Sequence, residues 1–251
     1  PDAAAKARAP HLLYGHVPAR DLYSVGRWAE DAKRALAQVQ AMGKVPIFVG
    51  GTGLYFMALE DGLATIPPIP DAVREAARAL LTQIGVEALH ECLAARDPET
   101  ASGLRPSDPQ RVLRAWEVIE ATGRPLAAWQ REPAAPILKD LRLARILLDP
   151  EREHLRAAIA ARFETMLEAG LAEARALEGL DPSLPAAKLL GLRPLQALAR
   201  GEMAREAAIF AAVTATRQFA KRQMTWFRGR MAPYRRYDPM ESNIIAEIKD
   251  V

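Results

Sequence analysis

The chain has 251 residues, half of them hydrophobic and 26% charged, which suffices for one large domain or for a core and a smaller lobe. This composition excludes a disordered chain, and the one cysteine, Cys92, excludes an internal disulfide. The net charge is +3, with arginine as the main basic residue, and the longest nearly uncharged run, 45–59, is too short to span a membrane. We therefore expect a cytoplasmic protein that has no membrane segment and no metal-ligand cluster.

The first part of the chain predicts a piece of an α/β sheet protein. Residues 1–20 carry loop signals, and residues 25–42 have the apolar spacing of an amphipathic helix. The apolar run 45–49 predicts a strand that is buried on both faces of a parallel sheet. A further helix is expected over 54–60.

A glycine loop, Gly50-Gly51-Thr52-Gly53, separates this strand from the next helix. Backbone N–H groups and the helix dipole at such a junction suit an anion, and Thr52 adds a hydroxyl group there. An ordinary tight turn is the alternative, because the loop matches neither a dinucleotide fingerprint nor a P-loop.

A change of composition predicts an inserted lobe. Three prolines within 66–70 predict a stiff extended linker, residues 71–123 carry helix signals, and a second soft stretch follows at 131–136. We therefore expect an all-helical lobe over 66–138, inserted into an α/β core that consists of residues 1–65 and 139–251.

The last third of the chain returns to the core. Residues 141–148 predict a strand, although two arginines interrupt its apolar run. Long helices are expected at about 151–169, 170–178 and 204–228.

The best-signalled helix of the lobe runs from Asp108 to Thr122, with Asp108 as the N-cap. Gln110, Arg111 and Arg114 lie in its first turns, where each positive charge opposes the helix dipole at a cost of roughly 0.3–1 kcal/mol. No acidic partner is evident for these arginines, so the pattern favours contact with RNA phosphates or a base edge. A salt bridge to a distant carboxylate remains the alternative.

A second basic segment covers residues 216–230. Arg217, Lys221 and Arg228 fall on one side of a helix, and no acidic residue occurs between Glu206 and Asp238. Trp226 and Phe227 are interleaved with these cations. The pattern favours a polyanion-binding helix, and a solvated basic face is the alternative.

Taken together, these segments resemble the tRNA dimethylallyltransferase family, also called the tRNA isopentenyltransferase family, over most of the chain. The motifs that carry the resemblance are Ala9-Pro10-His11, Tyr23-Ser24-Val25, residues 49–56, residues 108–115, residues 122–126 and residues 216–226. Their order and spacing together are specific for this family.

The resemblance implies a P-loop-kinase-like core with a parallel sheet, incomplete here and rich in helices, and an inserted helical lobe that grips the anticodon stem-loop of tRNA. Such an enzyme transfers a dimethylallyl group from dimethylallyl diphosphate to N6 of the adenosine 3′ to the anticodon. Mg²⁺ assists the diphosphate, and we expect a monomer.

The resemblance also assigns roles by position. It implies catalytic roles for Thr52 and Arg217. It implies tRNA contacts for Arg74, Gln110, Arg111, Val112, Leu113 and Arg114. It implies diphosphate contacts for Gly50, Gly51, Lys221 and Arg222, and it implies no metal ligands within this chain.

Two departures from the family pattern matter. The family's P-loop and its Asp-Ser-x-Gln-x-Tyr segment, which holds the presumed general base, lie upstream of residue 1, so we expect an N-terminally truncated member whose Mg²⁺ ligands belong to that upstream part. The family's Gly-Tyr-Arg-Gln reads Gly191-Leu192-Arg193-Pro194 here, which leaves a role for Arg193 open. The alternative functions are a non-catalytic RNA-binding module and a transferase that prenylates free adenylate.

Overall fold

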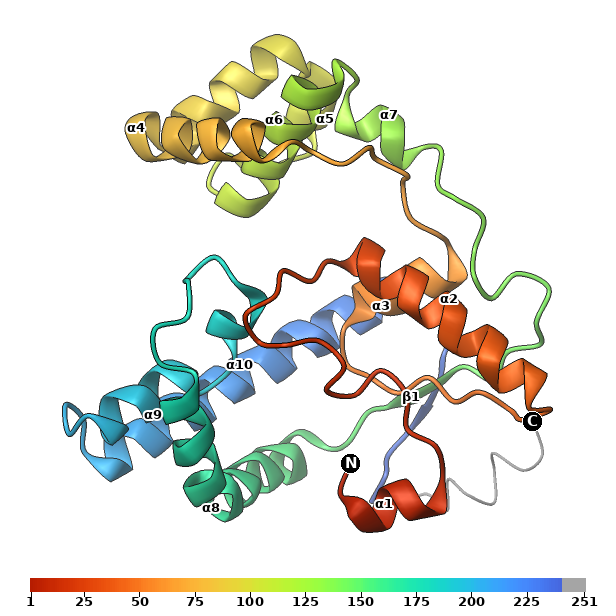
Figure 1. Ribbon diagram of the computed structural model, residues 1–251, viewed down its shortest axis with the longest axis vertical. Helices are drawn as coiled ribbons and strands as arrows, with labels where there is room; N and C mark the ends of the chain where they lie inside the picture. The colour runs from red at the N-terminus through yellow and green to blue at the C-terminus, as the bar shows by residue number, and fades with distance from the viewer. Residues whose placement is uncertain (241–251) are drawn as a thin grey trace. The chain divides into compact units, whose positions relative to one another are not determined.

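The computed structural model describes residues 1–240, which divide into two compact units (Figure 1). One unit, called the core unit below, consists of residues 1–56 and the chain from 140 onward, and the other, the helical unit, consists of residues 57–139. The sequence places the same insertion at 66–138. The helix α3 (Gly53–Glu60) contains the first of these unit boundaries.

The core unit holds a small parallel sheet and most of the long helices (Figure 1). Its elements besides α3 are α1 (Ala3–Arg8), α2 (Val25–Ala41), β1 (Ile146–Leu148), α8 (Arg152–Ala176), the 3₁₀ helix η1 (Pro185–Lys188), α9 (Leu192–Ala199), α10 (Arg205–Arg230) and β2 (Arg235–Tyr237). β1 and β2 pair in parallel, with Ile146 opposite Arg235 and Leu148 opposite Tyr237.

Two small apolar clusters stabilise the core unit. Leu167 and Ala174 of α8 pack against Leu192 and Leu195 of α9, and α10 contacts both helices. The second cluster joins the sheet to the end of α10, and its buried members are Leu147, Phe227 and Met231. Burial of these side chains fixes the C-terminal half of α10 against β1.

The helical unit consists of four helices around one apolar core. They are α4 (Asp71–Arg96), α5 (Pro98–Ser102), α6 (Pro109–Thr122) and α7 (Leu126–Gln130). Leu89 and Leu93 of α4 meet Val112 and Ala115 of α6, and all four side chains are almost fully buried. The buried Asp97 carboxylate accepts hydrogen bonds from the backbone N–H groups of Thr100 and Leu126, which links α5 to α7.

Several helix predictions are confirmed. The helices α2, α3, α6 and α10 lie where the apolar spacing places them, and Asp108 caps α6 by accepting a hydrogen bond from the Arg111 N–H at 3.1 Å. The helix α4 is interrupted at Gly85, where the backbone takes a positive φ (φ 81°, ψ 170°) that favours glycine.

The prediction of a doubly buried strand at 45–49 is wrong. This segment forms no strand, and Val45, Ile47 and Val49 are 85%, 84% and 76% exposed. A parallel strand obtains its burial from neighbouring strands and from helices on both faces. Within residues 1–240, no strand lies beside this segment.

Four other expectations need smaller corrections. Residues 1–20 are not all loop, because α1 forms there behind the N-cap Asp2. The strand at 141–148 shrinks to β1, and the helices expected at 151–169 and 170–178 are one continuous helix, α8. The prolines at 66–70 do not form a free linker, since Ile69 is 4% exposed within the core of the helical unit.

The segments that enter and leave the helical unit are paired with each other. Leu59 O accepts a hydrogen bond from Leu138 N at 3.0 Å, and Leu63 O accepts one from Ala134 N at 2.8 Å. A side chain at Gly62 would overlap the Ala134 carbonyl. None of the helices in the described part of the chain is long and apolar enough to cross a membrane.

Candidate active site at the glycine loop

The glycine loop, residues 50–53, is held by side chains of the helix α10. The Gln223 side chain donates a hydrogen bond from Nε2 to the Gly51 carbonyl oxygen at 2.7 Å. A Cβ atom at Gly51 would overlap this amide, and a Cβ atom at Gly53 would overlap the indole ring of Trp226. These two glycines therefore allow α10 to approach the loop closely.

The loop glycines do not have left-handed backbone angles. Close packing, and not conformational freedom, explains why Gly51 and Gly53 carry no side chain. One side of the loop is occupied by Gln223 and Trp226, and the contact of its backbone N–H groups with an anion stays a prediction.

Thr52 lies at the start of α3 with an exposed side chain. Its carbonyl oxygen accepts a hydrogen bond from Tyr55 N at 2.9 Å, which forms the first turn of α3. The Tyr55 ring stacks on Trp28 of α2, with ring centroids 4.2 Å apart and an interplanar angle of 17°. Two helices, α2 and α10, thus fix the residues around Thr52.

The second half of α10 carries exposed cations next to these buried contacts. Arg217, Lys221 and Arg222 are exposed, and none of them forms an ion pair with a carboxylate within residues 1–240. The Arg222 guanidinium lies over the Phe219 ring at 5.8 Å. Such a set of exposed, unneutralised cations on one helix can attract a multiply charged anion.

The aromatic residues of α10 have a structural role. Phe227 is 8% exposed within the cluster that joins α10 to β1, and the Trp226 ring covers Gly53. These packing contacts account for Trp226 and Phe227, and the interpretation of α10 as a polyanion-binding helix stays a prediction. Val213 and Phe227 are buried side chains of α10.

The first turns of α6 differ from the prediction in one respect. Arg111 pairs with Asp108 at 3.5 Å and Arg114 pairs with Glu117 at 3.6 Å, both one turn away on the same helix. The inference that these arginines lack a local acidic partner is wrong. Gln110 is exposed in the same turn.

Two residues of this segment belong to the apolar core. Val112 is fully buried, and Leu113 is half-buried against the same core, so Val112 contributes packing and its side chain reaches no external ligand. Arg74 lies in the first turn of α4, 3.9 Å from the Asp71 carboxylate. Arg74 and the segment 110–114 thus belong to the helical unit, whereas Thr52 and Arg217 belong to the core unit.

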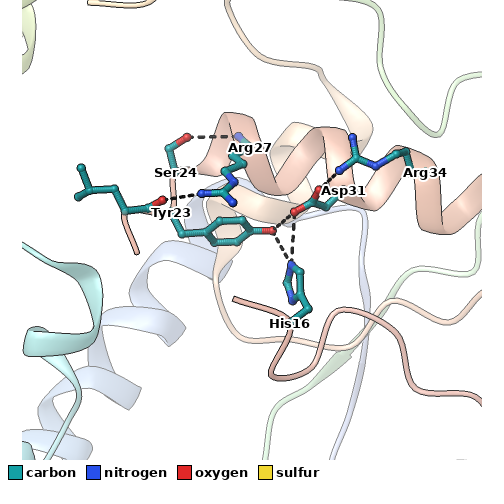
Figure 2. A network of polar contacts seen from close by, with 7 residues as sticks. His16, Tyr23, Ser24, Arg27, Asp31 and Arg34 are labelled. Carbon is teal, nitrogen blue, oxygen red and sulfur yellow. Dashed lines mark hydrogen bonds and ion pairs between the residues drawn. The ribbon is translucent and has the colours of Figure 1, made fainter. Parts of the chain in front are cut away.

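A polar network that sequence reasoning missed surrounds the start of α2 (Figure 2). The Tyr23 hydroxyl donates to Asp31 Oδ2 at 2.6 Å, and His16 Nε2 lies 2.9 Å from the same hydroxyl. Arg34 forms an ion pair with the other oxygen of Asp31. Figure 2 shows that these side chains converge on the Asp31 carboxylate.

The electrostatic consequences follow from these contacts. The hydrogen bond from Tyr23 is the main reason that the pKa of Asp31 lies below its ordinary value. Burial, with the neighbouring Asp31 carboxylate, raises the pKa of Tyr23 well above its ordinary value. Asp31 is therefore a charged anchor for the segment that precedes α2.

The described residues do not fit a metal centre built from protein ligands. Within residues 1–240, no group of three His, Cys, Asp or Glu side chains is arranged so that it could hold a metal ion. The polar groups that the described residues offer at the glycine loop are backbone donors and the Thr52 hydroxyl group.

Comparison with known proteins decides the family. Residues 1–230 match the family described as IPP transferase. The chain belongs to the IPP transferase family. The sequence-based identification of a tRNA isopentenyltransferase relative is thereby confirmed.

Relatives within this family are similar over nearly the whole chain. The chain is 51% identical to the tRNA dimethylallyltransferase of Rhodospirillum centenum, with 95% of this chain and 77% of the relative covered. It is 50% identical to the tRNA dimethylallyltransferase of a Bradyrhizobium species, over 93% of this chain and 77% of the relative.

Solved structures agree with this assignment. The tRNA isopentenylpyrophosphate transferase of Bacillus halodurans matches with a TM-score of 0.63 and 28% identity, over 99% of this chain and 78% of that protein. A eukaryotic dimethylallyltransferase acting on tRNA matches with a TM-score of 0.77 over 94% of this chain and 62% of that protein. At 23% identity, this second match shows the fold alone.

Proposed function

We propose that this IPP transferase family member is an enzyme that transfers a dimethylallyl group from dimethylallyl diphosphate to N6 of the adenosine 3′ to the anticodon of tRNA. The observations that support the proposal are the exposed cations Arg217, Lys221 and Arg222 on α10, the helix that also holds the glycine loop through Gln223. Relatives named tRNA dimethylallyltransferase at about 50% identity support it as well. The core that supports this site is proposed to be P-loop-kinase-like.

The chemistry follows from where charge develops. The primary allylic carbon loses diphosphate as N6 attacks, so negative charge grows on the leaving oxygen. N6 gives up one proton in the same reaction, and water or the released diphosphate can accept it. Arg217 is assigned to this charge, with Lys221 and Arg222 and the Gly50 and Gly51 backbone beside it, because donors placed before the reaction stabilise charge most effectively. Mg²⁺ bound to the diphosphate oxygens belongs to the proposal, and no step depends on a protein ligand for it.

The acceptor is proposed to reach the site by leaving its base stack. An adenine inside a stacked anticodon loop cannot present N6 to the donor, so it must be extruded into a pocket. Thr52, exposed at the start of α3, is the side chain assigned to this adenine. The anticodon stem-loop is assigned to four residues of the helical unit, Arg74, Gln110, Arg111 and Arg114. The enzyme is proposed to be cytoplasmic and to work as a monomer.

The experiment uses labelled dimethylallyl diphosphate with full-length enzyme and two acceptors. Label is expected in tRNA and not in free adenylate. Label in adenylate would support the adenylate transferase alternative, and binding of tRNA without any label would support the RNA-binding module. Digestion of the tRNA to nucleosides then shows whether the label resides on the adenosine 3′ to the anticodon.

A further inference from the structure

A tertiary hydrogen bond joins Gly51 of the glycine loop to Gln223 of α10. Residues 44–52 form neither helix nor strand, and the alternate side chains that precede the loop are exposed. Gln223 nevertheless reaches Gly51 across 172 positions of the sequence, and its side chain is half-buried. A side-chain amide that is partly desolvated and bonded to a distant backbone carbonyl restricts that peptide unit strongly.

The hydrogen bond to the Gly51 carbonyl also determines the direction of the Thr52 N–H. The C=O of Gly51 and the N–H of Thr52 belong to the same peptide unit, which is planar and trans, so they point in opposite directions. Because the carbonyl is held by Gln223 of α10, the Thr52 N–H is directed away from Gln223. Within residues 1–240, this N–H has no hydrogen-bond partner.

Trp226 makes the arrangement rigid. Gln223 and Trp226 are one helical turn apart on α10, and they contact Gly51 and Gly53 on either side of Thr52. The exposed cations Arg217 and Lys221 belong to the same helix. Contacts from a single helix therefore fix the backbone on both sides of Thr52.

We propose that Gln223 is a positioning residue, which holds the Gly51 carbonyl so that the Thr52 N–H is presented as a fixed donor to the anionic diphosphate. The proposal rests on the proposed function for the identity of the anion. Gln223 itself touches neither donor nor acceptor in this scheme. Its effect operates through the orientation of one peptide unit.

The test replaces Gln223 by an isosteric side chain without a donor. Gln223→Met should lower the single-turnover rate of dimethylallyl transfer by about a hundredfold, as expected when a reacting group is displaced slightly. The affinity for tRNA and the melting temperature should stay close to those of wild type. Gln218→Met is the matched control, since Gln218 is exposed on the same helix and makes no contact with the loop. Equal rates for the two variants would overturn the proposal.

A second pair of variants separates positioning from folding. Gly51→Ala forces the Gln223 side chain out of place, and the double variant Gly51→Ala, Gln223→Ala removes this overlap. The double variant should recover the melting temperature but not the transfer rate, because the Gly51 carbonyl is no longer held. Recovery of the rate together with the melting temperature would show that Gln223 serves packing only.

Binding of inorganic pyrophosphate tests the positioning role of Gln223 independently of catalysis. Calorimetry on wild type, Gln223→Met and Gln218→Met should show a loss of affinity of about tenfold for Gln223→Met alone. Unchanged pyrophosphate affinity in Gln223→Met would contradict the proposal. A wild-type enzyme that binds pyrophosphate with Gln223-dependent affinity but transfers no label would refute the proposed function and leave the positioning role supported.

Discussion

The helices α6 and α10 both carry arginines that were expected to meet an external anion, but their surroundings differ. In α6, Arg111 and Arg114 each have a carboxylate one turn away. In α10, Arg217 and Lys221 have none within residues 1–240, because no acidic residue occurs between Glu206 and Asp238. Exposed pairs spaced by one turn contribute only about 0.3–0.5 kcal/mol, so an RNA phosphate can displace Asp108 from Arg111, whereas the α10 cations need no displacement.

This difference in local ion pairing indicates different roles for the two helices. Cations that are neutralised locally are released by a partner that brings many phosphates, and each contact then adds a little affinity. Cations without a carboxylate partner keep their full positive electrostatic potential. This potential can stabilise negative charge that develops during a reaction. We therefore expect α6 to affect binding and α10 to affect turnover.

The largest effect is expected from Arg217→Ala in the full-length enzyme. Loss of a donor to the developing charge should lower single-turnover transfer by about 100-fold to 1,000-fold and leave the affinity for tRNA nearly unchanged. Arg162→Ala, an exposed arginine of α8, is the control. A normal rate for Arg217→Ala, or a large loss of tRNA affinity, would break the division between the two helices.

The packing between the Trp226 ring of α10 and Gly53 should tolerate no side chain at Gly53. Gly53→Ala is expected to lower the free energy of unfolding by about 2–3 kcal/mol, because its Cβ overlaps the Trp226 ring in a packed cluster. Gly50→Ala is the matched control, since a Cβ at Gly50 meets only Phe56 at 3.8 Å. Urea unfolding measures both, and equal stabilities would show that α10 can move away from the loop.

A smaller effect is expected from Arg111→Ala. The affinity for tRNA should fall by about 1–2 kcal/mol, and the slope of log affinity against log salt should become shallower by about one, because one fewer counterion is released. Arg156→Ala is the control, since Arg156 of α8 pairs with Glu153 at the same spacing as Arg111 with Asp108. An unchanged salt slope for Arg111→Ala would remove α6 from the tRNA interface.

The smallest effect concerns the network around Asp31. Since the pKa of Asp31 is lower in the folded protein than in the unfolded chain, its contribution to stability is present above about pH 4 and is lost as the pH falls below this value. Tyr23→Phe removes the main cause of the shift, so its stability should fall less steeply in acid than that of wild type. Unfolding curves between pH 7 and pH 3 measure this, and parallel losses in both proteins would contradict the assignment.

The sequence predicts those elements whose signals are local. Apolar periodicity locates α2, and the N-cap Asp108 locates the start of α6 to the residue. The run 45–49 shows the limit, because an apolar pentapeptide carries no information about what covers it. β2 was missed because Arg235-Arg236-Tyr237 is short and has no apolar alternation.

The candidate site was predictable only in part, for the same reason. The glycine loop and the cations of α10 are visible as motifs, but a contact between Gly51 and Gln223 spans 172 positions and has no local signal. Glycines at 51 and 53 indicate that something approaches closely, and they do not identify it. The local partners of Arg111 and Arg114, in contrast, lie within three residues and could have been read from the helical spacing.

The pairing of the two segments that bound the helical unit has a consequence for how such a chain can change over generations. Its entry and exit meet side by side, with Leu63 bonded to Ala134 and Leu59 to Leu138. An insertion whose two ends are already joined can be lengthened, replaced or removed without pulling apart the chain around it. A short turn that connects Leu63 directly to Ala134 would close the gap, so this junction is a natural place to exchange one inserted helical unit for another.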